Sequence, residues 1–415
     1  MKLLKLFSLI IISFLAMAVF NPIQAQETNA QDLSNVLAEF EADSIDAQDF
    51  NMEEPSVLPG QFQYNWQKFK ENVGLFFTFD QEKKINKLEE ISNRRLLEAK
   101  KLADTGTANA ASRVEEALKN YQEAKQKIAT KLVANPELQQ TLLEKLDANQ
   151  IKHEQILSTV TEKLRDKIPA DQLTRLENIK KEDALNWYNT NSEDIQQRLE
   201  NAIDNNNLGS KFKQLSNIAT LQELGDILPE NARTRIEAAN TKAEEKLSER
   251  LQNINTTDQQ KLEKYINNIK TTEIVKQKFI SNLKDSTELP QAVKEKAASI
   301  FDNYSANMLQ RFQNLDPSEQ EKFLNQFENE SRSHPANIKF LEDLNKIENN
   351  DRIKYLIEIQ IEGVKAKIQG TTDPAKLKSL EQNLSENPVL RRQIQQRQSE
   401  IRNAPDPSPS IMPQR

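Results

Sequence analysis

The chain is poor in the residues that most often carry chemistry: its 415 residues include no cysteine, 7 glycines and 2 histidines. The absence of cysteine excludes disulfide bonds, thiolate metal ligands, a cysteine nucleophile and a lipid attached through cysteine. The few glycines are scattered and form no loop that could cradle a phosphate group. Two separated histidines do not supply the neighbouring ligands of a zinc site. The sequence therefore predicts no cofactor and no metal.

The two histidines stand in contexts that predict surface positions. His153 and Glu154 begin like a zinc-protease motif, but Leu157 occupies the position of the second histidine. His334 precedes Pro335 in a predicted turn, where we expect it to be solvated. Carboxylate pairs are numerous, as on any charged helical surface, and none is singled out. We therefore predict no catalytic, cofactor-binding or metal-binding residue, and a protein that is not an enzyme.

Low glycine content and the balance of apolar and charged residues indicate helices. Hydrophobic residues make up 37% of the chain and charged residues 29%, which suits helices that each bury one apolar stripe. Leucine, lysine, glutamate and glutamine are all good helix formers. The fold is thus predicted to be all-α. A net charge of −7, with both signs interspersed, argues against nucleic acid or anionic lipid as the main partner.

The N-terminal residues 1–25 have the layout of a secretory signal peptide. Lys2 and Lys5 precede an apolar run, Leu6–Phe20, and Ala25 stands before a polar stretch. We expect export, to the cell envelope or beyond it, with cleavage after Ala25. The alternative is retention of this segment as a membrane anchor, although the run is shorter than the roughly 20 residues that a spanning helix needs.

Two further segments are predicted to be disordered. Residues 26–58 contain nine carboxylates and no lysine or arginine, which is typical of an acidic linker. A calcium loop is the alternative, but the spacing of the acids and a central glycine are missing. Within the linker, the helical spacing of four apolar residues indicates one short amphipathic turn, at Leu33, Val36, Leu37 and Phe40. Residues 399–415 form a proline-rich tail.

Aromatic residues are concentrated between residues 59 and 80. This segment contains Phe62, Tyr64, Trp66, Phe69, Phe76, Phe77 and Phe79. Such density predicts a packed nucleus that locks the following helices in place. The alternative is an aromatic patch that binds a partner.

Residues 81–134 read as an antiparallel helical hairpin. The first helix runs to about Asp104, and a turn at Gly106 leads into the second. Apolar residues of the second helix recur at alternating spacings of three and four, which is a short heptad seam. The first helix has the stripe Ile85, Leu88, Ile91, Leu96, Ala99 and Leu102, and the second has Val114, Ala117, Tyr121, Ala124 and Ile128.

Short stretches of this region carry a resemblance to a known family. They are Pro59-Gly60 followed by Tyr64, then Phe69-Lys70-Glu71-Asn72-Val73, then Leu75-Phe76-Phe77-Thr78-Phe79-Asp80, and Asn93-Arg94-Arg95-Leu96-Leu97-Glu98-Ala99. Over residues 59–128 the sequence resembles the bacterial domain of unknown function DUF5667. The resemblance implies an exported or membrane-tethered bacterial protein with a helical hairpin, and it implies no activity.

The remainder of the chain contains an internal repeat. Residues 250–262 and 311–323, which are 61 residues apart, share Arg, Gln, Asn, Gln and Lys at equivalent positions. Weaker copies begin after Ile168-Pro169 and at residues 371–377. Each unit reads as a short helix, a long helix, a capped turn and a second amphipathic helix. Units of this kind stack on their neighbours, so we predict an elongated array; the alternative is a divergent helical bundle.

The repeated turn has the residues of a helix N-terminus. Asp316 can cap a helix, Pro317 suits its first position and Glu319 completes a capping box. Thr257 with Gln260 can do the same in the preceding unit. The four predicted units are residues 135–210, 211–270, 271–330 and 331–398.

Aromatic residues within the units fall on apolar stripes, and we expect them to form core. They are Trp187, Tyr188, Phe212, Phe279, Phe301, Tyr304, Phe312, Phe323, Phe327 and Phe340. The alternative is a concave groove between units that binds a partner.

Together these patterns favour a structural or protein-interaction module of the bacterial cell envelope. The sequence identifies neither the partner nor the oligomeric state, and a membrane enters only if the N-terminal segment is retained. Two alternatives stay open: a chaperone-like helical clamp with an apolar inner face, and a cell-wall hydrolase with two opposed carboxylates in a cleft.

Overall fold

The computed structural model describes residues 44–105, 110–165, 167–191, 194–205, 212–329, 333–371, 374–384 and 387–403. Within these residues the chain is helical and forms no strand, so the predicted all-α class is confirmed. The predicted signal peptide, the first part of the linker and the end of the tail lie outside the described residues. No helix of the described part is both long and apolar enough to cross a bilayer.

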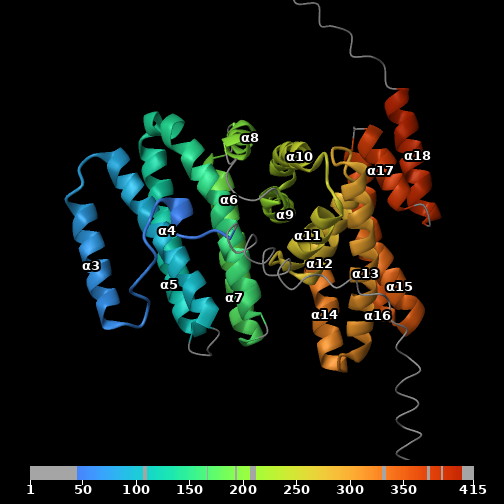
Figure 1. Ribbon diagram of the computed structural model, residues 1–415, viewed down its shortest axis with the longest axis horizontal. Helices are drawn as coiled ribbons and strands as arrows, with labels where there is room; N and C mark the ends of the chain where they lie inside the picture. The colour runs from blue at the N-terminus through green and yellow to red at the C-terminus, as the bar shows by residue number, and fades with distance from the viewer. Residues whose placement is uncertain are drawn as a thin grey trace, which may run out of the picture.

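The helices follow one another with short connections and stack into an elongated array (Figure 1). After a short 3₁₀ helix, η1 (Gln48–Phe50), come α3 (Phe62–Phe76), α4 (Gln81–Thr105), α5 (Ala110–Ala134), η2 (Pro136–Leu138), α6 (Gln139–Leu164), α7 (Ala170–Asn191), α8 (Ile195–Asn205), α9 (Lys213–Ile227), α10 (Glu230–Leu251), α11 (Thr256–Asn268), α12 (Glu273–Asp285), α13 (Gln291–Asn314), α14 (Pro317–Asn329), α15 (Pro335–Glu348), α16 (Asp351–Gly370), α17 (Pro374–Asn383) and α18 (Pro388–Arg402). Helix α3 lies at one end of the array and α18 at the other.

Helices α4 and α5 form the predicted hairpin. They span the residues expected from the two apolar stripes and pack closely along their length. All five residues of the heptad seam, from Val114 to Ile128, are buried. The two alanines of that seam, Ala117 and Ala124, let the two helices approach each other closely.

One long helix of each unit recurs at a nearly constant spacing, and the series includes the second helix of the hairpin. Helices α5, α7, α10, α13 and α16 begin at residues 110, 170, 230, 291 and 351, so successive starts are 60 or 61 residues apart. The sequence predicted that the repeat begins only at residue 135. The structure places the hairpin in the same series, as its first member.

The first two units touch at residues one repeat apart. Asn149 Nδ2 donates to Glu89 Oε1 at 3.0 Å, and Arg175 Nε donates to Glu115 Oε1 at 2.9 Å. In both pairs the partners are 60 residues apart, which is one repeat. Stacking with this regular offset is the arrangement expected of a helical solenoid.

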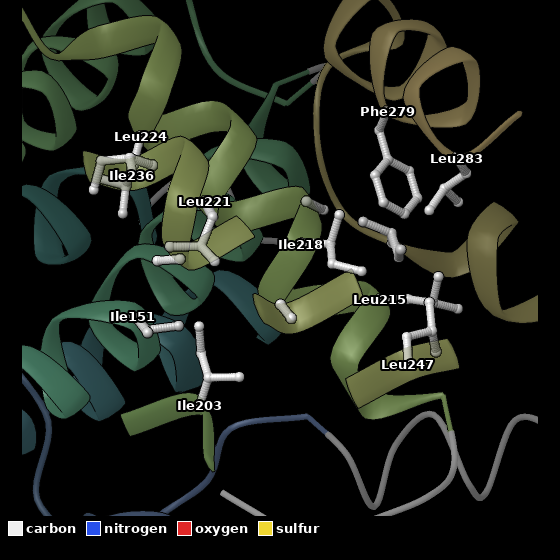
Figure 2. Packing of buried hydrophobic residues seen from close by; sticks show 14 of the residues in the cluster. Ile151, Ile203, Leu215, Ile218, Leu221, Leu224, Ile236, Leu247, Phe279 and Leu283 are labelled. Atoms are coloured by element: carbon white, nitrogen blue, oxygen red, sulfur yellow. The ribbon is translucent and has the colours of Figure 1, made fainter. Parts of the chain in front are cut away.

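The buried apolar residues form several clusters, and one of them occupies the middle of the array, from α6 to α15. Helix α9 is central to this cluster: Leu215, Ile218 and Leu221 are buried in it, and Leu215 and Ile218 lie near Phe279 and Leu283 of α12 (Figure 2). The aromatic residues predicted to form core do so. Trp187, Tyr188, Phe212, Phe279, Phe301, Phe312, Phe323, Phe327 and Phe340 are buried, and Tyr304 packs against the core as a partly buried residue.

One of the two predicted helix caps is present and the other is replaced. Glu319 N donates to Asp316 Oδ1 at 2.9 Å and Asp316 N donates to Glu319 Oε2 at 3.2 Å, which is the predicted capping box. At the equivalent turn the cap is Asn255, whose Oδ1 accepts from Asp258 N at 2.9 Å. The prediction of Thr257 was wrong because α11 already begins at Thr256.

The end of the predicted linker is ordered. Residues 44–58, which we call the strap, bury Ile45, Ala47 and Phe50 against the core beside α4 and α6. Lys100 Nζ donates to Ile45 O at 2.5 Å and Lys152 Nζ donates to Asp49 O at 2.7 Å. The prediction of disorder failed for the strap because its cationic partners come from helices far along the chain. Similarly, α18 extends through Arg402 into the predicted tail.

Candidate functional site: the outer face of α3

Helix α3 packs on the hairpin through its polar side. Tyr64 is its one buried residue, and Asn120 Nδ2 of α5 donates to the Tyr64 hydroxyl at 3.1 Å. Gln67 Nε2 donates to Glu98 Oε1 of α4 at 3.4 Å. Glu71 accepts hydrogen bonds from two arginines of α4. The apolar side of α3 consequently faces away from the rest of the chain.

That outward side carries a continuous apolar row. Its members, which we call the α3 stripe, are Phe62, Trp66, Phe69, Val73 and Phe76, with exposed fractions between 38% and 90%. They recur at spacings of four, three, four and three residues, so they align along one face of the helix. Phe77 and Phe79, both exposed, extend the row beyond the end of α3.

The structure overturns the predicted packed nucleus at residues 59–80. Of its seven aromatic residues only Tyr64 is buried, and the aromatic patch, the alternative reading, describes the arrangement. The reason is that α3 docks by charged and polar groups, which turns its aromatic side outward. A signal was present in the sequence: an apolar seam with heptad spacing opposite a polar row of Tyr64, Gln67 and Glu71.

The side chains of the stripe support one another. The rings of Trp66 and Phe69 stack with centroids 5.3 Å apart, and Phe76 meets Phe77 edge to face at 5.2 Å. Lys70 Nζ lies 5.4 Å from the centre of the Trp66 ring. Such mutual contacts restrict rotamers before any partner arrives, which lowers the entropy lost on docking.

Beneath α3 lies a buried ion pair cluster. The guanidinium of Arg95, whose side chain is 1% exposed, pairs with Glu71 and donates to Glu98 Oε1 at 2.6 Å. Arg94, 35% exposed, also donates to Glu71, at 2.8 Å. Burial raises the pKa of Glu98 to about 7, although Arg95 acts in the opposite direction. These charges hold α3 in its orientation.

His153 is buried, not at the surface as predicted. Its Nε2 lies 2.6 Å from Asn93 Oδ1 and its Nδ1 lies 3.2 Å from the Tyr121 hydroxyl. That hydroxyl donates to Asp183 Oδ2 at 2.8 Å. Burial lowers the pKa of His153 well below its usual value, so the ring is neutral. The prediction failed because the partners of both ring nitrogens come from two other helices, α4 and α5.

Further hydrogen bonds extend this network along α6 and to α7. Gln150 Nε2 donates to Glu154 Oε1 at 3.0 Å and to Asp183 Oδ2 at 2.6 Å. Burial, with the charge of Asp183 as a second cause, raises the pKa of Glu154. The polar groups join the first two units of the array through their interior.

A cleft of about 720 Å³ lies between the strap, α3, α4 and α6. Its lining carries both charge signs, including Glu89, Arg94 and Lys152. Burial raises the pKa of Glu98, Asp147 and Glu154, and none of these carboxylates is among the lining residues. In the described part of the chain no three carboxylate or histidine side chains gather closely enough to hold a metal.

His334 also differs from its prediction as a solvated turn residue. It is the N-cap of α15: its Nδ1 accepts from Ala336 N at 3.1 Å, and its Nε2 lies 2.9 Å from Asn282 Oδ1. Burial lowers its pKa well below the usual value. Both histidines therefore have structural roles.

Substituting Tyr121→Phe is expected to lower the free energy of unfolding by about 1–3 kcal/mol, the usual cost of leaving buried polar groups without a partner. The change removes one hydroxyl from between His153 and Asp183. Urea unfolding followed by circular dichroism measures it. Tyr355→Phe, at an exposed position on α16, serves as the control and should stay within about 0.5 kcal/mol of wild type. Equal stability of both variants would contradict the role given to the network.

Comparison with known proteins adds one finding. No curated protein and no solved structure shows significant similarity to the chain. Residues 56–167 match a family described as Domain of unknown function (DUF5667), which extends the resemblance seen in residues 59–128. The matched segment reaches from α3 to the end of α6 and so contains the α3 stripe, the ion pair cluster and His153. This segment of the chain, α3 to α6, thus matches the DUF5667 family, and the match covers about a quarter of the chain.

Proposed function

We propose that the protein is an exported, non-enzymatic helical module that binds another protein through the α3 stripe. The observation that carries the proposal is the exposed aromatic row on α3, at the free end of a stacked array. Terminal units of stacked arrays ordinarily present a polar outer face, because an apolar one exposes core-like surface to water.

The size of the surface supports a protein partner. With about 200 Å² for a fully exposed aromatic side chain, the stripe with Phe77 and Phe79 presents about 900 Å² of apolar surface. The largest apolar patch of a typical monomer measures about 300–600 Å². A stable protein interface needs about 800 Å² from each partner, so this surface is sufficient alone.

The location at the cell envelope rests on the layout of residues 1–25. If that segment is cleaved, the mature protein is released; if it is retained, its apolar run holds the array at a membrane. In both cases the α3 stripe is available to other exported proteins.

The two other functions considered from the sequence find less support. A helical clamp needs an apolar inner face, but away from residues 59–80 the described large exposed apolar residues stand singly on different helices: Val133, Ile347, Tyr355 and Val389. A hydrolase needs opposed carboxylates in a cleft, one of them in apolar surroundings. The carboxylates with raised pKa values lie between packed helices instead.

A photo-crosslinking amino acid placed at Phe69, in cells that produce the protein, tests the proposal. We expect one adduct of defined mass from position 69 and none from position 389, an exposed apolar site on α18. Fractionation of the same cells with N-terminal sequencing of the mature chain establishes its location. Absence of any adduct at position 69 would rule out this surface as a binding site.

A further inference from the structure

The width of the α3 stripe identifies the kind of surface that covers it. At 100° per residue its five members fall within roughly 80° of the helix circumference, as in a coiled-coil seam, whereas a helix lying in a lipid surface has a broader apolar face. The alternation of four and three residues is likewise the spacing at which one helix meets another. A helix therefore fits this seam better than a bilayer does.

The flanks of the stripe are compatible with a second identical helix. Asn65 and Asn72 border it on one side, and Gln63 and Lys70 on the other. Three of these four residues are neutral, so two copies brought together meet little like-charge repulsion. The single lysine is also too little positive charge for strong attraction to an anionic membrane.

We propose that the partner of the α3 stripe is a second copy of this chain, paired antiparallel about a two-fold axis that crosses α3 near Phe69. This inference rests on the proposed function and names its partner. The stripe together with Phe77 and Phe79 offers about 900 Å² on each copy, which is of the size of a standard interface. Two-fold pairing is also the commonest symmetry of soluble oligomers.

The antiparallel direction follows from the shape and dipole of α3. Trp66 is the largest member of the stripe and Val73 the smallest, and they lie on opposite sides of Phe69. Antiparallel pairing about Phe69 sets Trp66 of each copy against Val73 of the other. It also places the helix dipoles head to tail, which is electrostatically favourable. The resulting dimer joins two arrays at their α3 ends, with both α18 ends outermost.

Sedimentation of the purified chain over about a hundredfold range of concentration tests this dimer. We expect twice the mass of one chain for the wild type. Phe69→Glu buries two like charges near the axis and should raise the dimer dissociation constant at least about a hundredfold. Val389→Glu, the same change at the far end of the array, should leave the dimer intact. Circular dichroism confirms that both variants fold.

Mixing two oppositely charged variants makes the test specific for self-association. Phe69→Glu and Phe69→Lys should each be monomeric, and their equimolar mixture should form a heterodimer because the opposite charges meet at the axis.

A monomeric wild type, or an unchanged dimer in Phe69→Glu, would overturn the inference. If the wild type is monomeric but position 69 still crosslinks in cells to a different protein, the proposed function stands and only the identity of the partner is wrong. Flotation of the monomer with vesicles of anionic lipid, lost in Phe69→Glu, would instead assign the stripe to a membrane.

Discussion

Replacing Arg95 by alanine is expected to lower the free energy of unfolding of the first unit by about 3–5 kcal/mol, the cost of breaking a buried ion pair from one side. Arg95 pairs with Glu71 of α3 and with Glu98 of α4, and its side chain is 1% exposed. The substitution leaves Glu98 buried without a cation and removes the main contact that orients α3. It also removes the guanidinium that lies 5.1 Å from the ring centre of Tyr64.

Arg94→Ala is the matched control for this variant. Arg94 is adjacent, pairs with the same Glu71 and is 35% exposed, so solvent already screens its charge. We expect a loss of less than about 1 kcal/mol. Urea unfolding monitored by circular dichroism gives both values. Similar losses in the two variants would contradict the importance given to the buried cluster.

Replacing Glu98 by glutamine is expected to change how stability depends on pH. Burial raises the pKa of Glu98 from 4.5 to about 7 in the folded chain. Between these two values the folded state holds the proton more tightly than the unfolded state. The wild type therefore loses stability as the pH rises through this window, by about 3 kcal/mol at roughly 1.4 kcal/mol per pKa unit.

The glutamine variant cannot ionise and escapes this loss. Relative to wild type, its free energy of unfolding should rise by about 3 kcal/mol between pH 4.5 and pH 7 and remain constant above that. Unfolding curves of both proteins at pH 4.5, 6 and 8 measure the difference; the value at the lowest pH contains any effect of the amide that does not depend on ionisation. A difference that is the same at all three would show that Glu98 ionises normally in the folded chain.

The sequence was sufficient for the fold class and the hairpin because both depend on local patterns. The seam from Val114 to Ile128 follows from spacing alone. The similarity of residues 250–262 to 311–323 revealed the repeat, because turns and caps constrain residue type strongly. The hairpin was not recognised as a member of the series, since outside such turns only the positions of helices recur.

The orientation of α3 could not be predicted from the sequence, for a physical reason. An aromatic row is equally suited to a core and to a binding surface, and what decides between them is the other side of the helix. Glu71 turns inward because Arg95, 24 residues later, is buried and needs a carboxylate. Such a pairing is visible only once α3 and α4 are placed side by side.

The burial of His153 has a related explanation. Its contacts reach Asn93 and Tyr121, 60 and 32 residues away, which lie in the preceding unit. A single histidine in a charged helix looks like a surface residue as long as only its own helix is considered. In a stacked array, however, the inner side of each helix is defined by the neighbouring unit.

Because the units recur at a constant spacing, the length of the array can change without a change in its binding surface. The first two units meet through residues 60 positions apart, and one long helix per unit keeps this spacing along the array, so a unit added or lost is expected to preserve the stacking. The α3 end and the α18 end would then stand farther apart or closer together, with the α3 stripe unaltered. Duplication or deletion of one unit would therefore change the length of the array in discrete steps. The partner bound at the α3 stripe would stay the same.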